Sequence, residues 1–158
     1  MMKENGPCVL MILDGWGLSE SKESGNAIAM AKTPFLDSMI KRYPNTRLQC
    51  SGKSVGLPEG IMGNSEVGHM NIGAGRVVYQ GLLRIDLSIE NRSFFDNDAF
   101  ISVMSKVKEK KSALHLMGLV SDGGVHSQLA HLFALIDMAI QKGITEIYVH
   151  AILDGRDT

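Results

Sequence analysis

Apolar and polar positions change in pattern along the chain, and these changes predict strands and helices in alternation. A continuous apolar run over residues 8–13 ends at an Asp-Gly pair that begins with Asp14, which is typical of a fully buried strand. Thr33 and Pro34 together indicate a helix start, with Thr33 as the N-cap and Pro34 at the first helical position. Apolar residues then follow at helical spacing until Pro44 ends the helix.

The second half of the chain repeats this alternation with stronger patterns. The predicted elements are a short strand over 46–50, helices over 82–90 and 100–111, a strand over 113–120, a helix that Ser127 caps and Gly143 ends, and a strand over 144–153. The last three form a strand–helix–strand unit, for which a right-handed crossover is expected. The alternation as a whole predicts the α/β class.

Size and charge set limits on the class of protein. With 158 residues, of which 44% are hydrophobic and 21% charged, the chain can form an ordinary globular domain with a core. Its net charge of -1 provides no bulk attraction to nucleic acid or to an anionic membrane. No apolar run is long enough to span a bilayer, and the first residues lack the layout of a signal peptide. Cys8 and Cys50 are predicted to be buried, reduced thiols, so we expect a cytoplasmic protein.

The most informative stretch for chemistry is a glycine-rich run around Ser65. Gly63 and Gly68 bracket the serine, and Gly73 and Gly75 follow closely. Glycines allow a sharp turn and the close approach of a ligand. A serine at such a turn, at the start of a helix, is placed as a nucleophile, but its hydroxyl needs an activating group at neutral pH.

Several other motifs have better structural explanations. The Gly-Lys-Ser triplet at 52–54 resembles the end of a phosphate-binding loop, but Arg47 stands where that loop needs a glycine. The serine motif is not a nucleophile elbow, because Gly68 comes one residue too late. The five histidines show no zinc-ligand spacing. His115 and His150 lie in predicted strands, and hydrogen-bonded structural roles are expected for both.

Three polar clusters follow predicted strands. They are the Asp-Gly pair at 14–15, the loop over 121–126 and the segment over 154–157. Taken singly, Asp14 and Asp122 are well explained as turn residues. Taken together, the clusters indicate a ligand site, because ligands bind beyond the carboxyl ends of strands in open α/β sheets.

At this point the motifs can be compared with a known family. The chain closely resembles the N-terminal part of cofactor-independent (2,3-bisphosphoglycerate-independent) phosphoglycerate mutases, metal-dependent enzymes of the alkaline phosphatase superfamily. The resemblance covers the whole chain, with matching motifs over 9–17, 25–28, 33–34, 58–76, 119–127 and 149–158.

The resemblance implies a fold and a division into domains. It implies an alkaline-phosphatase-like mixed or parallel sheet with helices on both faces. Residues 1–79 would form the N-terminal part of the metal-binding, phosphatase-like domain. Residues 80–158 would form the first part of an inserted α/β phosphotransferase domain.

The resemblance also implies an activity, the interconversion of 2-phosphoglycerate and 3-phosphoglycerate in glycolysis and gluconeogenesis. A metal-activated serine takes up the phosphoryl group and returns it to the other hydroxyl. Two divalent ions are implied, manganese first and magnesium as the alternative, with no bisphosphoglycerate cofactor. The implied partner is a small-molecule substrate, without nucleic acid or membrane.

Individual roles follow from the same resemblance. Ser65 is implied as the nucleophile and as a metal ligand, and Asp14 as a carboxylate ligand of the same metal. The implied substrate-binding residues are His126, Arg156 and Asp157.

The chain departs from the family pattern in two respects. Gln128 stands where the family has a histidine, and its amide forms hydrogen bonds but does not titrate. Family enzymes are several times longer, and their C-terminal metal ligands and further substrate-binding arginines and lysine are absent from these 158 residues. Asp14 and Ser65 alone are too few ligands for a closed metal site.

Two interpretations therefore stay open, a part of an active mutase or a non-catalytic stand-alone fragment. The motifs over 121–127 and 154–157 disfavour a third, an unrelated metal phosphohydrolase with the same serine, because the resemblance assigns them to the mutase's substrate domain. We expect the 158-residue chain alone to lack mutase activity and to self-associate through exposed apolar surface, whereas full-length members of the family are expected to be monomers.

Overall fold

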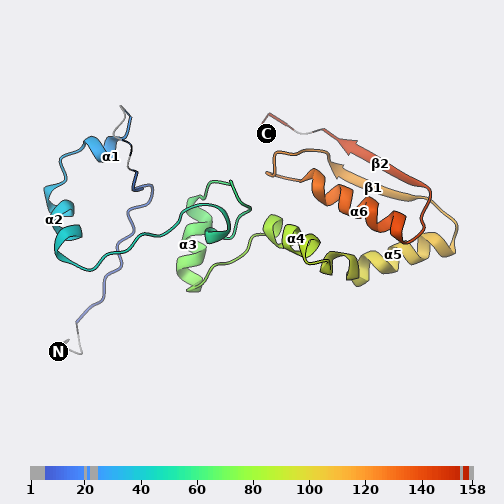
Figure 1. The fold of residues 1–158 in the computed structure, drawn as a ribbon, viewed down its shortest axis with the longest axis horizontal. Coiled ribbons are helices and arrows are strands. Elements are labelled where there is room, and N and C mark those ends of the chain that lie inside the picture. The colour runs from blue at the N-terminus through green and yellow to red at the C-terminus, as the bar shows by residue number, and fades with distance from the viewer. Residues whose placement is uncertain (1–5, 20, 22–24, 154, 157–158) are drawn as a thin grey trace. The chain divides into compact units, whose positions relative to one another are not determined.

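The chain separates into two units, Met1–Gln49 and Cys50–Thr158, in the computed structural model (Figure 1). The structure describes residues 6–19, 21, 25–153 and 155–156. None of the helices in this described part is both long and apolar enough to cross a membrane. The proposed domain boundary after residue 79 concerns the longer family enzyme and stays a prediction.

The first unit contains the predicted helix that begins with a Thr-Pro pair. It holds α1 (Ala27–Met30) and α2 (Pro34–Arg42), and Pro34 occupies the first turn of α2, where its missing N–H costs no hydrogen bond. Thr33 is the N-cap residue, but its hydroxyl donates to Asp37 Oδ1 at 3.0 Å instead of accepting from the backbone. Tyr43 is extended (φ -121°, ψ 155°), as the residue before a proline must be, and α2 ends there.

The predicted strand over residues 8–13 is wrong. The described residues of this segment have no strand partner, and the side chains of Val9, Leu10 and Met11 are 74–78% exposed. A continuous apolar run shows that a segment favours burial, but a strand also requires neighbouring backbone to accept and donate hydrogen bonds. The predicted strand over 46–50 is wrong for the same reason, since the nearest pairing is an isolated bridge between Ser51 and Met62.

The two cysteines are free thiols, as predicted, but they are not buried. Cys8 lies in the extended first segment, and Cys50 lies at the beginning of the second unit. Both side chains are exposed. The apolar neighbours that suggested burial are themselves exposed in the first segment, which explains why the prediction of burial failed.

The second unit contains the remaining helices at or near their predicted positions. Its helical elements are η1 (Gly52–Val55), α3 (Ser65–Ala74), α4 (Gly81–Glu90), η2 (Ser93–Asp96), α5 (Asp98–Glu109) and α6 (Leu129–Gln141), where η denotes a 3-10 helix. Asn97 caps α5, since its Oδ1 accepts from the backbone N–H groups of Ala99 and Phe100 at 3.0 and 3.2 Å. Lys106 and Lys108 lie in the last turn of α5, where cations interact favourably with the helix dipole.

The predicted strand–helix–strand unit is confirmed. Strand β1 (Leu114–Leu119) pairs in parallel with β2 (Ile147–Ile152), and α6 connects them (Figure 1). Gly143 ends α6 in the left-handed conformation (φ 79°), as predicted. The prediction that Ser127 caps α6 is wrong, because the N-cap residue is Gln128 and its side chain makes no capping hydrogen bond. The described chain is therefore mixed α/β with a two-stranded parallel sheet.

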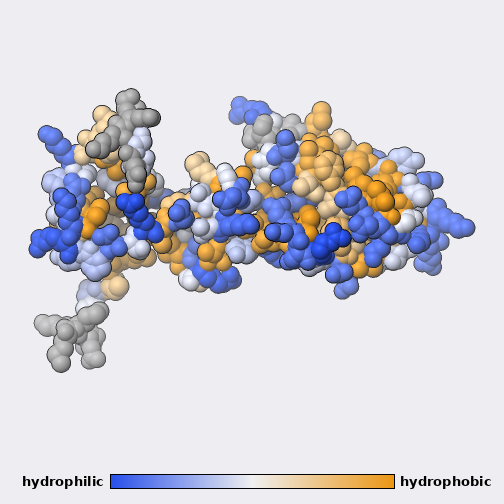
Figure 2. Space-filling view, viewed as in Figure 1, coloured by the Kyte–Doolittle hydropathy of each residue, from blue (hydrophilic) through white to orange (hydrophobic). Residues whose placement is uncertain are grey.

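The core of the second unit lies on one face of this sheet. Its buried residues come from α5, β1, α6 and the segment before β2, and they are Met104, Leu114, Met138, Ala139 and Ile144. Side chains alternate between the two faces of a strand, so the other face carries His115, Met117 and Tyr148. Met117 is 74% exposed and Tyr148 is 53% exposed. Figure 2 shows apolar side chains at the surface of this part of the molecule.

This asymmetry predicts a large loss of stability for one methionine substitution and a small change for another. Met138→Ala removes a side chain that is 1% exposed, and we expect the free energy of unfolding to fall by about 2–5 kcal/mol. Met117→Ala on the open face should change it by less than about 1 kcal/mol. Urea denaturation followed by circular dichroism measures both values, and equal losses would contradict this location of the core.

Candidate functional site

Ser65 is the first residue of α3, as the glycine-rich run predicted. The preceding residue Asn64 is extended (φ -140°, ψ 174°), and its Oδ1 accepts a hydrogen bond from the backbone N–H of Val67 at 3.0 Å. This cap fixes where the helix begins. The Ser65 side chain is exposed, and Glu66 adds an acidic group to the first turn. Ser65 therefore lies at the positive end of a helix of 10 residues.

The glycines around Ser65 serve different purposes. Gly63 donates its N–H to the carbonyl oxygen of Cys50 at 3.1 Å, and a Cβ at Gly63 would overlap that same oxygen. Only glycine permits this approach of two backbones. Gly75 ends α3 with φ 64°. At Gly68 and Gly73 a Cβ would have no atom within 4 Å, so these residues leave open space on the surface of α3.

The amide side chain of Asn71 joins helix α3 to the end of η1 and to the loop that follows α3. Asn71 donates from Nδ2 to the carbonyl oxygen of Val55 at 3.1 Å, and its Oδ1 accepts from the N–H of Val78 at 2.8 Å. The apolar contact beneath is small, with Val55 8% exposed and Val67 5% exposed. A partly buried amide with both of its polar atoms paired thus contributes to the support of Ser65.

His69 lies one helical turn after Ser65 and contacts it. The distance from His69 Nδ1 to Ser65 Oγ is 3.1 Å, and the distance from the same nitrogen to the Ser65 carbonyl oxygen is 2.8 Å. Both side chains are exposed. No role of His69 was predicted from the sequence, although a spacing of four residues puts two side chains on the same face of a helix.

Asp14 lies in a β-turn. Trp16 donates its N–H to the carbonyl oxygen of Leu13 at 3.0 Å. Gly15, at the third position of the turn, has φ 77°, a value that glycine adopts readily. Asp14 belongs to the first unit and Ser65 to the second. Among the described residues, no group of three or more His, Cys, Asp or Glu side chains is placed to hold a metal ion. The role of Asp14 as a metal ligand stays a prediction.

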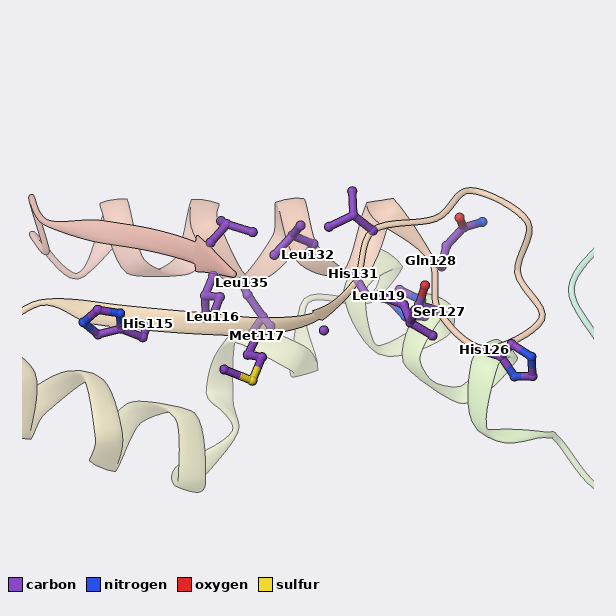
Figure 3. A pocket seen from close by; sticks show the side chains of 13 residues that line it. His115, Leu116, Met117, Leu119, His126, Ser127, Gln128, His131, Leu132 and Leu135 are labelled. Atoms are coloured by element: carbon purple, nitrogen blue, oxygen red, sulfur yellow. The ribbon is translucent and has the colours of Figure 1, made fainter. Parts of the chain in front are cut away.

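The loop between β1 and α6 carries His126 and borders a pocket of about 430 Å³. Figure 3 shows His126 on this loop and Gln128 at the beginning of α6, with Ser127 between them near Leu119. The rest of the wall is formed mostly by apolar residues of β1 and α6, together with His115, His131 and Val149. The Ser127 hydroxyl is buried and makes no hydrogen bond. The pocket thus combines an apolar wall with a few polar groups at the carboxyl end of β1.

A side-chain hydrogen bond joins α4 and α6 next to this loop. His131 Nε2 on α6 lies 2.6 Å from Asp86 Oδ1 on α4, and the two side chains are 16% and 33% exposed. The residues are separated by 45 positions in the sequence, so no local pattern could have indicated their contact.

The expected hydrogen-bonded role of the two strand histidines is confirmed. His115 Nδ1 lies 2.8 Å from His150 Nε2, and the two rings stack with 5.1 Å between their centres. His115 also stacks on Tyr148, its direct partner across the parallel pair. Both histidines are exposed and lie on the open face of the sheet.

The residues after β2 are only partly described. Arg156 is exposed and follows the end of β2, where the sequence predicted it. Asp157 lies outside the described residues, as does Asp154. The role of Arg156 toward a substrate stays a prediction.

Comparison with known proteins finds similar proteins of one family. Residues 85–158 match the family model described as BPG-independent PGAM N-terminus. The chain is 59% identical over 157 residues to 2,3-bisphosphoglycerate-independent phosphoglycerate mutase 2 of Methanosarcina acetivorans, a match that covers 99% of this chain and 30% of that protein. It is 58% identical over 152 residues to the 2,3-bisphosphoglycerate-independent phosphoglycerate mutase of Synechocystis, which covers 96% and 28% of the two chains.

A solved structure is similar over most of the chain. Leishmania mexicana phosphoglycerate mutase, crystallised at low cobalt concentration, matches with a TM-score of 0.60 and 40% identity over 84% of this chain and 24% of that chain. The fold is thus that of one part of a phosphoglycerate mutase. Over almost its whole length, the chain is thus similar to one part of the BPG-independent phosphoglycerate mutases. It spans about 30% of the length of the curated relatives it matches.

The close approach at Gly63 yields a prediction about the support of Ser65. Gly63→Ala should disrupt the contact with Cys50 and lower the free energy of unfolding by about 1–3 kcal/mol. Gly73→Ala, in open space within α3, should raise it by up to about 1 kcal/mol because alanine favours helix. Thermal unfolding and amide hydrogen exchange over residues 50–75 measure both effects. Equal protection of the amides at positions 63 and 64 from hydrogen exchange, in Gly63→Ala and in the parent chain, would contradict the prediction.

Proposed function

We propose that this chain supplies the nucleophile-bearing part of an enzyme that interconverts 2-phosphoglycerate and 3-phosphoglycerate through a phosphoserine at Ser65. The observation that carries the proposal is the exposed hydroxyl of Ser65 at the N-terminus of α3. The similarity to these relatives supports it, because they are named phosphoglycerate mutases.

The surroundings of Ser65 suit a phosphoryl group. The N-terminus of a helix presents unpaired backbone N–H groups and the positive end of the helix dipole, both of which favour an anion. Gly68, one turn after Ser65 on α3, has no side chain and leaves space on the helix surface. In the first step the Ser65 oxygen bonds to phosphorus and the substrate oxygen leaves with a proton. In the second step the other hydroxyl of the glycerate takes the phosphoryl group and Ser65 is restored.

A divalent metal ion fits the donor types of the chain but not the number of donors in the described part. Asp14 supplies a carboxylate and Ser65 a hydroxyl, the hard oxygen ligands that Mn²⁺ and Mg²⁺ prefer. These two residues would hold the ion together with ligands from the part of the longer enzyme that this chain does not include. When bound, the ion would lower the pKa of the serine hydroxyl and neutralise charge on the phosphoryl oxygens.

The proposed substrate contacts lie after β1 and β2. The Arg156 guanidinium suits a carboxylate or phosphate, and His126 on the loop suits a phosphoryl oxygen. Asp157 would accept from a substrate hydroxyl. Gln128 can orient a substrate through hydrogen bonds but cannot exchange protons with it. We further propose an alkaline-phosphatase-like domain over 1–79, an inserted transferase domain from 80 onward, and a cytoplasmic place in glycolysis.

A second candidate function is a non-catalytic fragment of such an enzyme. It is favoured by the lack, among the described residues, of any group of three metal-binding side chains. Both candidates predict that the 158-residue chain alone gives no turnover with Mn²⁺ in an enolase-coupled assay. They differ in what the chain does when the rest of a mutase is supplied.

A chimera separates the two candidates. The chain replaces the matching portion of the Methanosarcina acetivorans mutase, to which it is 59% identical. We expect the chimera to interconvert the two phosphoglycerates, and Ser65→Ala to lower kcat/KM at least about a thousandfold because no other group can take the phosphoryl group. The matched control is Ser88→Ala on α4, whose hydroxyl donates to the carbonyl oxygen of Ile85 and which should keep its activity. An inactive parent chimera that folds normally would contradict the mutase proposal.

The metal proposal predicts a specific effect of one carboxylate. In the active chimera, Asp14→Asn should raise the Mn²⁺ concentration for half-maximal activity by at least about tenfold, because the amide is a weaker ligand than the carboxylate. Asp37→Asn in α2, where the carboxylate accepts from the Thr33 hydroxyl, is the matched control and should leave the metal requirement unchanged. Equal metal requirements in both variants would exclude Asp14 as a ligand.

A further inference from the structure

We propose that His69 is a positioning residue for Ser65. His69 donates a hydrogen bond from Nδ1–H to the serine and does not act as its base. The proposal rests on the proposed function of Ser65 as nucleophile. It starts from the two short contacts that one ring nitrogen makes with the same residue, 2.8 Å to the carbonyl oxygen and 3.1 Å to Oγ.

The carbonyl contact determines where the proton lies. A carbonyl oxygen can only accept, so a distance of 2.8 Å from Nδ1 requires a hydrogen on that nitrogen. The same N–H faces Ser65 Oγ, which therefore accepts as well. The lone pair of the neutral imidazole is then on Nε2, the nitrogen that does not contact Ser65.

The opposite arrangement is unfavourable. If Ser65 Oγ donated its proton to Nδ1, the Nδ1 lone pair would also face the carbonyl oxygen at 2.8 Å. Two acceptors at that distance repel each other, and the carbonyl would lose the hydrogen bond that this geometry offers. A serine–histidine pair of the hydrolase type is thus excluded, although the two side chains are in contact.

The donated hydrogen bond has a consequence for catalysis. A hydrogen bond to an ionised oxygen is about twice as strong as one to a neutral oxygen, so Nδ1–H stabilises the deprotonated form of Ser65 more than the hydroxyl. The contact also restricts the rotation of Oγ about the Cα–Cβ bond of Ser65. His69 in this way favours the nucleophilic state of Ser65 and fixes its direction.

The rest of the helix is compatible with this role. Asn64 caps the same turn, because its Oδ1 accepts from the backbone N–H of Val67. The first turn is therefore stabilised by this cap as well as by the His69 contact. Gly73, one turn after His69, puts no side chain on the same face. The His69 ring is exposed, and its Nε2 edge is accessible to solvent or to a ligand.

The position of the proton can be measured on the 158-residue chain itself. Nitrogen-15 NMR distinguishes a protonated ring nitrogen from an unprotonated one, and the spectrum of His69→Gln assigns the signals by their loss. At neutral pH we expect His69 to carry its proton on Nδ1. The Ser65→Ala variant should keep that tautomer, because the backbone carbonyl remains. An unprotonated Nδ1 in the parent chain would overturn the proposal.

A pair of variants in the chimera measures the effect on transfer. His69→Asn can place an amide N–H near the position of Nδ1, whereas His69→Leu offers no donor. We expect His69→Leu to lower kcat about 10- to 100-fold with KM changed less than threefold, and His69→Asn to recover at least a tenth of the lost activity. Equal losses in both variants would overturn the positioning role. An inactive parent chimera would instead contradict the proposed function, and the NMR result alone would then decide the proton position.

Discussion

The geometry around Ser65 depends on a backbone contact that no side chain would permit. Gly63 and Cys50 approach so closely that a Cβ at Gly63 would overlap the Cys50 carbonyl oxygen. Their hydrogen bond of 3.1 Å joins the segment before η1 to the segment before α3. Asn64 follows in an extended conformation and caps the helix, and Ser65 becomes its first residue. The position of Ser65 is thus determined by a steric constraint, with only a small apolar core beneath it.

Local rules predicted those elements that local interactions stabilise. The helix starts at Pro34 and Ser65 and the end of α6 at Gly143 were all predictable, because caps, prolines and left-handed glycines act within one turn. The parallel pair β1–β2 was predictable because α6 between them has a clear apolar face. The segment over 8–13 shows the limit of such rules. Its residues favour burial, but its sequence does not specify the partner strands that burial requires.

The site was predicted in part, and the missed contacts are of two kinds. The position of Ser65 followed from its glycines, but the contact with His69 was overlooked even though the spacing of four residues was available in the sequence. The hydrogen bond between Asp86 and His131 could not have been found, because it joins two helices whose packing is decided by tertiary structure. Asn71 belongs to the second kind as well, since its partners are Val55 at the end of η1 and Val78 in the loop after α3.

The contact between Ser65 and His69 also shows why proximity alone does not define a catalytic pair. A histidine near a serine suggests a general base, and a distance of 3.1 Å would satisfy that role. The second contact of the same nitrogen, with a carbonyl oxygen that has no proton to give, reverses the direction of the hydrogen bond. Under the proposed function, the deprotonation of Ser65 would need another source, and the proposed cation with oxygen ligands would supply it. The proton position on one ring nitrogen thus links the geometry of α3 to the phosphoryl transfer that we propose for Ser65.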